Sequence, residues 1–132
     1  MNSQVKEKWI AALRSGEYEQ GKNKLRGSEG FCCLGVLCDL YTQETKMVGW
    51  EFRGYDENEH LPQDYWYFDE ESEFLPESVM EWAGLSIANP KVKVDVTGED
   101  DEEDWFYFDE ISTLNDSGYS FSALSNIIEE QL

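Results

Sequence analysis

The sequence has little of what a membrane span, a disulfide framework or a histidine-rich metal site would need. Among 132 residues it has one histidine, three cysteines and three prolines. No apolar run approaches the roughly 20 residues that cross a bilayer, and the N-terminus lacks the apolar segment of a secretory signal. We therefore expect a soluble, cytoplasmic protein without structural disulfides.

The scarcity of histidine and cysteine also argues against a metal site. Cys32, Cys33 and Cys38 lie inside the most apolar stretch of the chain, where we expect buried, reduced thiols. A structural zinc site needs four ligands, but His60 is the only histidine and it lies among acidic residues. A catalytic cysteine needs a base and an electropositive setting, and neither is evident. We predict no metal, no cofactor and no catalytic residue.

Positive charge is also scarce, and it is unevenly placed. Residues 1–53 carry 8 Lys and Arg against 7 Asp and Glu, whereas residues 54–132 carry 2 against 22. The first part is therefore nearly neutral, at +1, and the second carries −20. Such a field repels nucleic acid and anionic membranes and attracts basic protein surfaces. Because 14% of the residues are aromatic, we expect these carboxylates on folded structure rather than on a disordered tail.

The most apolar stretch is the expected core of the fold. Residues 31–41 read FCCLGVLCDLY, with apolar side chains on every side of a helical wheel and no alternation. This pattern predicts a helix that is buried on nearly all faces, and a fully buried strand is the alternative.

Capping residues and periodicity predict the other elements. Ser3 is a candidate cap for the first helix, and Gly16 is its expected end. Pro76 opens a second helix that Gly84 ends, and Ser120 is a candidate cap for the last one. The expected helices cover residues 4–14, 75–84, 109–114 and 121–131, and alternation indicates strands at residues 47–53 and 91–96.

One pattern occurs twice and we call it the aromatic repeat. Residues 64–70 read DYWYFDE, and residues 104–110 read DWFYFDE. Four consecutive aromatic residues favour a strand. We expect both copies in one antiparallel sheet, with the copies as candidates for pairing with each other and one set of rings in the core. The predicted fold is therefore a single α+β domain, with helices packed on a small antiparallel sheet.

The aromatic repeat and the segment before its second copy supply the predicted partner-binding surface. Residues 99–104 form an unbroken acidic run, denser than the solvated ends of a sheet explain. Plain solubility of an ordinary domain is the alternative interpretation of this charge. The predicted binding carboxylates are Asp64, Asp69, Glu70, Glu99, Asp100, Asp101, Glu102, Glu103, Asp104, Asp109 and Glu110.

The one basic cluster, Lys22, Lys24 and Arg26, offers an alternative ligand site. Nearby glycines and a following helix could hold a phosphate, and Trp50 or Tyr18 could stack on a base. The simpler interpretation is that these cations balance the acidic half of the protein, because no phosphate-loop spacing is present.

Several short motifs carry a resemblance to a known family. They are FCCLGVLCDL at residues 31–40, LNDSGYSF at residues 114–121, and shorter stretches at residues 9–13, 20–26, 75–76, 81–85 and 89–90. Together they resemble a family of small proteins of unknown function that tailed phages and prophages encode. The resemblance implies a phage gene and a site of action in the host cytoplasm, and it implies no mechanism.

Two hypotheses of different classes follow. The first is a non-enzymatic acidic inhibitor, a nucleic-acid mimic that blocks a basic groove of a host defence protein. The second is a small-molecule binder that sequesters a nucleotide signal at the basic cluster. A carboxylate-based hydrolase is a weaker third, because so many carboxylates make any one pair uninformative. Direct nucleic-acid binding is disfavoured by charge, and the oligomeric state, a dimer included, stays open.

Overall fold

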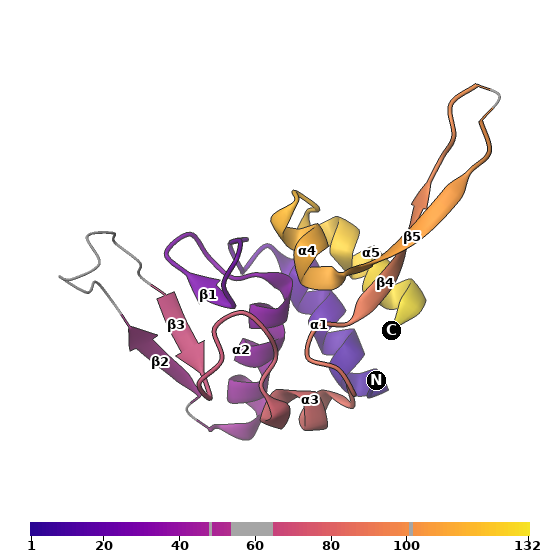
Figure 1. The fold of residues 1–132 in the computed structure, drawn as a ribbon. Helices are drawn as coiled ribbons and strands as arrows, with labels where there is room; N and C mark the ends of the chain where they lie inside the picture. Colours follow the sequence, from indigo (N-terminus) through magenta and orange to yellow (C-terminus); the bar gives the residue numbers. More distant parts are fainter. Residues whose placement is uncertain (48, 54–64, 101) are drawn as a thin grey trace.

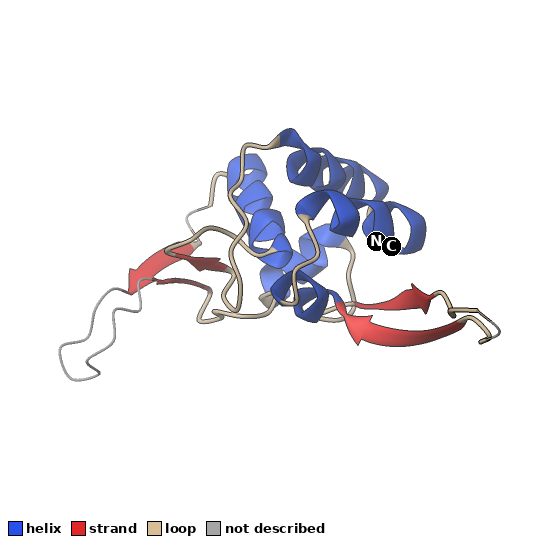
Figure 2. Cartoon of the chain, turned by 90° about the horizontal axis from the view of Figure 1, so that it is seen from above, coloured by secondary structure: helices blue, strands red, loops and turns tan. Residues whose placement is uncertain are grey.

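The computed structural model describes residues 1–47, 49–53, 65–100 and 102–132. A central body of helices carries two β-hairpins that project from opposite sides (Figures 1 and 2). The helices are α1 (Ser3–Ser15), α2 (Cys33–Thr45), α3 (Glu77–Ala83), α4 (Ile111–Asp116) and α5 (Phe121–Gln131). The strands are β1 (Arg26–Gly27), β2 (Trp50–Arg53), β3 (Tyr65–Phe68), β4 (Lys91–Val96) and β5 (Trp105–Glu110). The α+β class is confirmed.

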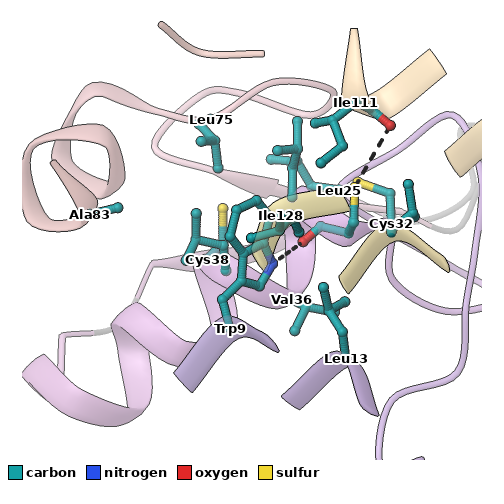
Figure 3. Close-up of a cluster of buried hydrophobic side chains, with 14 of the residues drawn as sticks. Trp9, Leu13, Leu25, Cys32, Val36, Cys38, Leu75, Ala83, Ile111 and Ile128 are labelled. Carbon is teal, nitrogen blue, oxygen red and sulfur yellow. Dashed lines mark hydrogen bonds between the residues drawn. The ribbon is translucent and has the colours of Figure 1, made fainter. Parts of the chain in front are cut away.

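The apolar stretch forms α2, and this helix is the centre of the core. Residues 32–38 are all buried, so the predicted helix is confirmed and the strand alternative is wrong. The indole Nε1 of Trp9 in α1 donates a hydrogen bond to the Cys33 carbonyl, 2.9 Å away (Figure 3). A Cβ on Gly35 would lie 1.7 Å from the Leu25 carbonyl oxygen, so the incoming chain passes directly over α2 at this glycine. The helices α1, α3 and α4 all pack against α2.

The helix ends match the sequence closely, with one correction. Asn2, not Ser3, caps α1, because its side-chain oxygen accepts hydrogen bonds from the backbone of Gln4 and Val5. Gly16 ends α1 in the left-handed conformation, with φ 78°.

The later helices also begin and end close to the expected residues. Gly84 ends α3 and the Ser120 hydroxyl caps α5, as expected. The helix expected over residues 109–114 begins two residues later, at Ile111, because Asp109 and Glu110 belong to β5.

The strands form two separate antiparallel sheets. One has the order β1-β3-β2, and the other consists of β4 and β5. The expected pairing between the two copies of the aromatic repeat is therefore wrong: β3 pairs with β1 and β2, and β5 pairs with β4. Each copy pairs with the strand that precedes it, as short connections favour. Of the strand expected over residues 47–53, only residues 50–53 form a strand, which is β2; residues 47 and 49 lie before it, and residue 48 lies outside the described residues.

Within the described residues, the helices are all too short or too polar to span a bilayer.

Candidate functional site

The hairpin of β4 and β5 is attached to the helical body through β4. Val92 and Val94 are buried against the body, whereas the residues that alternate with them are exposed. The Gln131 side chain of α5 accepts a hydrogen bond from the Lys93 backbone nitrogen at 2.6 Å and donates one to the Lys93 carbonyl at 2.8 Å. Gln131 thus covers the edge of β4 that faces away from β5. The other edge of β4 pairs with β5.

A folded turn connects the two strands and carries a group of carboxylates. The Gly98 backbone nitrogen donates a hydrogen bond to Asp104 Oδ1 at 2.9 Å, and the Glu102 nitrogen donates to the Glu99 carbonyl at 3.1 Å. A Cβ on Gly98 would lie 2.3 Å from the Glu102 carbonyl oxygen, so the turn requires glycine there. We call the described carboxylates of this turn the acidic tip; they are Glu99, Asp100, Glu102, Glu103 and Asp104, and all are exposed.

Next to the acidic tip, β5 exposes four large aromatic side chains. The exposed fractions are 56% for Trp105, 55% for Phe106, 37% for Tyr107 and 63% for Phe108. Trp105 and Tyr107 pack on each other on one face of the hairpin, with ring centroids 5.7 Å apart, and Phe106 and Phe108 do so on the other, at 5.9 Å. Exposed apolar surface of this kind marks interaction sites.

The first copy of the aromatic repeat lies in a different environment. Phe68 of β3 is fully buried, and the other three rings are half-buried. The expectation that one ring set enters the core is therefore met at Phe68 and is wrong for β5. A cation covers each of the half-buried rings: Lys24 lies 4.6 Å from the Tyr65 centroid, Arg26 lies 4.2 Å from that of Trp66, and Arg53 lies 4.0 Å from that of Tyr67.

The predicted carboxylates at the end of β3 do not join the acidic tip. Asp69 accepts a hydrogen bond from the Ser78 hydroxyl at 2.7 Å, and Glu70 pairs with Arg53 at 3.3 Å. Both directly follow β3, and Figure 1 shows β3 on the side of the body opposite the β4–β5 hairpin. The structure therefore divides the expected acidic surface into two separate parts.

The carboxylates at the body end of β5 have structural partners. Asp109 Oδ1 accepts a hydrogen bond from the Glu110 backbone nitrogen, and Glu110 Oε2 accepts one from the Asn89 side chain at 2.7 Å. Both residues are half-buried. Of the other predicted carboxylates, Asp64 and Asp101 lie outside the described residues.

A polar cavity of about 230 Å³ opens at the base of β5. Its lining includes the carboxylates Glu73, Glu110 and Asp116. Three carboxylates around one cavity disfavour a phosphate or any other anion. The remaining lining residues are Asn23, Cys32, Phe74, Asn89, Ser112 and Thr113.

The basic cluster interacts with other parts of the protein. Lys24 Nζ lies 3.5 Å from a Glu73 carboxylate oxygen as well as over the Tyr65 ring. Arg26 is half-buried over aromatic rings, and Lys22 is exposed. Lys24 thus pairs with a carboxylate, as the charge-balance interpretation expects, whereas Arg26 covers aromatic rings instead.

The two rings proposed for base stacking also have partners. The Tyr18 hydroxyl donates to one carboxylate oxygen of Asp39 at 2.6 Å, and Trp50 Nε1 donates to the other at 3.2 Å. Burial, together with the Asp39 carboxylate, raises the pKa of Tyr18, which keeps it a donor. These rings are part of the packing between α2 and the first sheet.

The cysteines are buried free thiols, as expected. Burial raises the pKa of Cys32 to about 12 and raises the pKa of Cys33 and Cys38 well above its ordinary value. Thiols of this kind stay protonated and are poor nucleophiles. In the part of the chain that the structure describes, no group of three or more His, Cys, Asp or Glu side chains is arranged to hold a metal ion.

Comparison with known families gives a match over the whole chain. The model of a domain of unknown function, DUF8296, matches residues 1–132. The chain belongs to this family. No curated protein and no solved structure matches it. The expected membership in a family of unknown function is thus confirmed at that level.

Two features of this DUF8296 domain were missed by sequence reasoning. Arg53 and Lys93, the cations that cover Tyr67 and Phe106, were not assigned a role. We expected only one set of rings to face water, and the exposure of all four rings of β5 differs from that expectation. The two copies of the repeat are nearly identical, and acidic residues precede both of them, so the sequence around the copies does not distinguish them. The cations that cover the first copy, Lys24, Arg26 and Arg53, lie more than ten residues before it in the chain.

Proposed function

We propose that this protein is a non-enzymatic acidic inhibitor of phage origin. It acts in the host cytoplasm and occupies a basic groove of a nucleic-acid-binding host protein, with carboxylates in place of phosphates. The observation that carries the proposal is the β4–β5 hairpin, which projects from the body and presents the acidic tip beside four exposed aromatic side chains (Figure 1).

The acidic tip is suited to an external partner because its charge is not neutralised within the protein. Among the described residues, none of its five carboxylates forms an ion pair with Lys, Arg or His. Like charges held close together repel one another and cost stability. A basic groove relieves that repulsion and gains affinity from the same charges.

The exposed rings of β5 add a contact that charge alone does not provide. Aromatic side chains bury large areas at interfaces, and their faces also attract Lys and Arg. Lys93 shows this chemistry within the hairpin, because its Nζ lies 4.5 Å from the Phe106 ring centroid. A basic groove therefore matches both the carboxylates and the rings.

The test is capture of partners from host lysate by the tagged protein at low and at raised salt. In the test variant, residues 99–104 are neutralised to Gln and Asn. The matched control neutralises six exposed glutamates outside the hairpin: Glu7, Glu17, Glu19, Glu29, Glu81 and Glu130. Both variants change the net charge equally, so a difference between them reports the position of the charge and not its amount.

We expect the unmodified protein and the control to capture the same basic nucleic-acid-binding protein, and the test variant to lose it. Capture should weaken as salt rises, and duplex DNA should compete for the partner. Equal capture by both variants, or a partner that DNA does not displace, would contradict the proposal. Stabilisation by nucleotides in a thermal-shift screen, lost on neutralising Lys22, would favour the nucleotide hypothesis instead.

A further inference from the structure

The two copies of the aromatic repeat differ in their backbone neighbours. β3 is the middle strand of its sheet, with β1 on one side and β2 on the other. β5 has β4 on one side, and among the described residues its backbone has no strand partner on the other. Such an edge is a template for an added strand. β5 therefore offers an edge that β3 does not.

The copies also differ in how many of their rings a cation covers. In β3, the three rings outside the core each have a Lys or Arg over them, from β2, β1 or the segment just before β1. In β5, Phe106 has Lys93, but Trp105, Tyr107 and Phe108 have no cation over them among the described residues. The first sheet thus shows, within the same chain, how single cations on or beside the flanking strands cover the rings of this sequence.

We propose that the free edge of β5 binds an extended basic segment of the partner as an added strand. This inference rests on the proposed function and names the kind of partner segment that the hairpin recognises. The segment carries Lys or Arg at alternate positions, as Lys24 and Arg26 do beside β3. Its backbone pairs with β5, and its side chains cover the exposed rings.

Strand addition accounts for the exposure of aromatic rings on both faces of the hairpin. Successive side chains of a strand point to opposite faces, so an added strand reaches both faces at once. It can contact Trp105 and Tyr107 on one face and Phe106 and Phe108 on the other. A flat surface laid against one face would leave two of the four rings exposed. The acidic tip at the end of β5 supplies the charge that attracts the basic segment.

The probe is a synthetic peptide of alternating arginine and leucine, added to the full-length ¹⁵N-labelled protein. We expect the largest amide shifts in β5 and the acidic tip. Methylating alternate backbone nitrogens of the peptide keeps its charge but blocks strand pairing, and should weaken binding about tenfold or more. Substituting one ring on each face, W105T with F108T, should weaken it about tenfold. The matched control is F52T, because Phe52 is an aromatic residue of β2 that is 53% exposed.

Three results would overturn the inference. The first is equal affinity for the methylated peptide, which means attraction by charge without strand pairing. The second is amide shifts confined to regions outside β5. The third is a dimer in solution that W105T with F108T dissociates, which means that a second copy of the chain occupies the edge. Tip-dependent capture from lysate without β5 shifts would refute strand addition and leave the proposed function standing. Peptide binding at β5 without capture of a partner from lysate would support strand addition and count against the proposed function.

Discussion

At the residue scale, the fourth aromatic position of the repeat shows how position in the fold decides the role of a side chain. Phe68 and Phe108 follow the same pattern of neighbours in the sequence, but Phe68 is fully buried and Phe108 is 63% exposed. Phe68 also packs edge-on against Trp50 and Tyr41. The same residue in the same motif therefore has a core role in one copy and a surface role in the other.

We predict that Phe68→Ala lowers the free energy of unfolding by about 3–5 kcal/mol, because it leaves a cavity in the core. Phe108→Ala should change it by less than about 1 kcal/mol. Urea unfolding followed by tryptophan fluorescence measures both. Equal losses in the two variants would show that β5 packs against the body after all.

Because the thiols are buried, we predict that the protein loses stability at alkaline pH. Because the pKa of Cys32 rises from 9.0 to about 12 on folding, the unfolded chain loses this proton first as the pH increases. The stability that comes from keeping Cys32 protonated in the fold is complete below pH 9, and it disappears as the pH approaches 12. Unfolding experiments across this range should show declining stability, and a thiol reagent at neutral pH should label all three cysteines only after denaturation. Fast labelling of the native protein would contradict this account.

At the element scale, β4 packs against the helical body, but we expect the outer end of the β4–β5 hairpin to contribute little to the stability of the fold. Val92 and Val94 attach β4 to the helices, whereas residues 97–104 lie beyond both strands. We predict that replacing residues 97–104 by a two-residue Asn-Gly turn leaves the melting temperature within a few degrees of that of the unmodified protein. The same change should abolish partner capture. A large fall in melting temperature would mean that the acidic tip supports the fold.

The sequence was a good guide to elements whose signals are local. The buried helix, the glycine ends of α1 and α3 and the Ser120 cap all depend on residues within a turn of the element. The pairing of the two copies and the exposure of all four β5 rings were predicted wrongly, because they depend on residues far away in the chain. Nothing within residues 104–110 distinguishes an edge strand from the central strand that the similar residues 64–70 help to form. The cations that cover β3 were visible in sequence, but their spatial role required the structure.

At the scale of the whole molecule, the acidic tip lies at the outer end of a hairpin that projects from the body. The helical body contains the core, and the net charge of −19 is concentrated in the second part of the chain. The described carboxylates divide between the two projecting hairpins and the body surface. Among the described carboxylates, those of the acidic tip combine a folded turn, a lack of ion pairs and an adjacent exposed aromatic strand. On the strength of this combination we propose that the β4–β5 hairpin is the surface that binds the partner.

Hydrogen–deuterium exchange of the protein, alone and in complex with the captured partner, tests this claim most directly. Backbone amides that pair with a partner strand exchange more slowly. We predict that the partner slows exchange in β5 and the acidic tip and leaves α1, α5 and the segment around Lys22 unchanged. Protection at the helices or the basic cluster, with β5 and the acidic tip unaffected, would contradict the account and place the binding surface elsewhere.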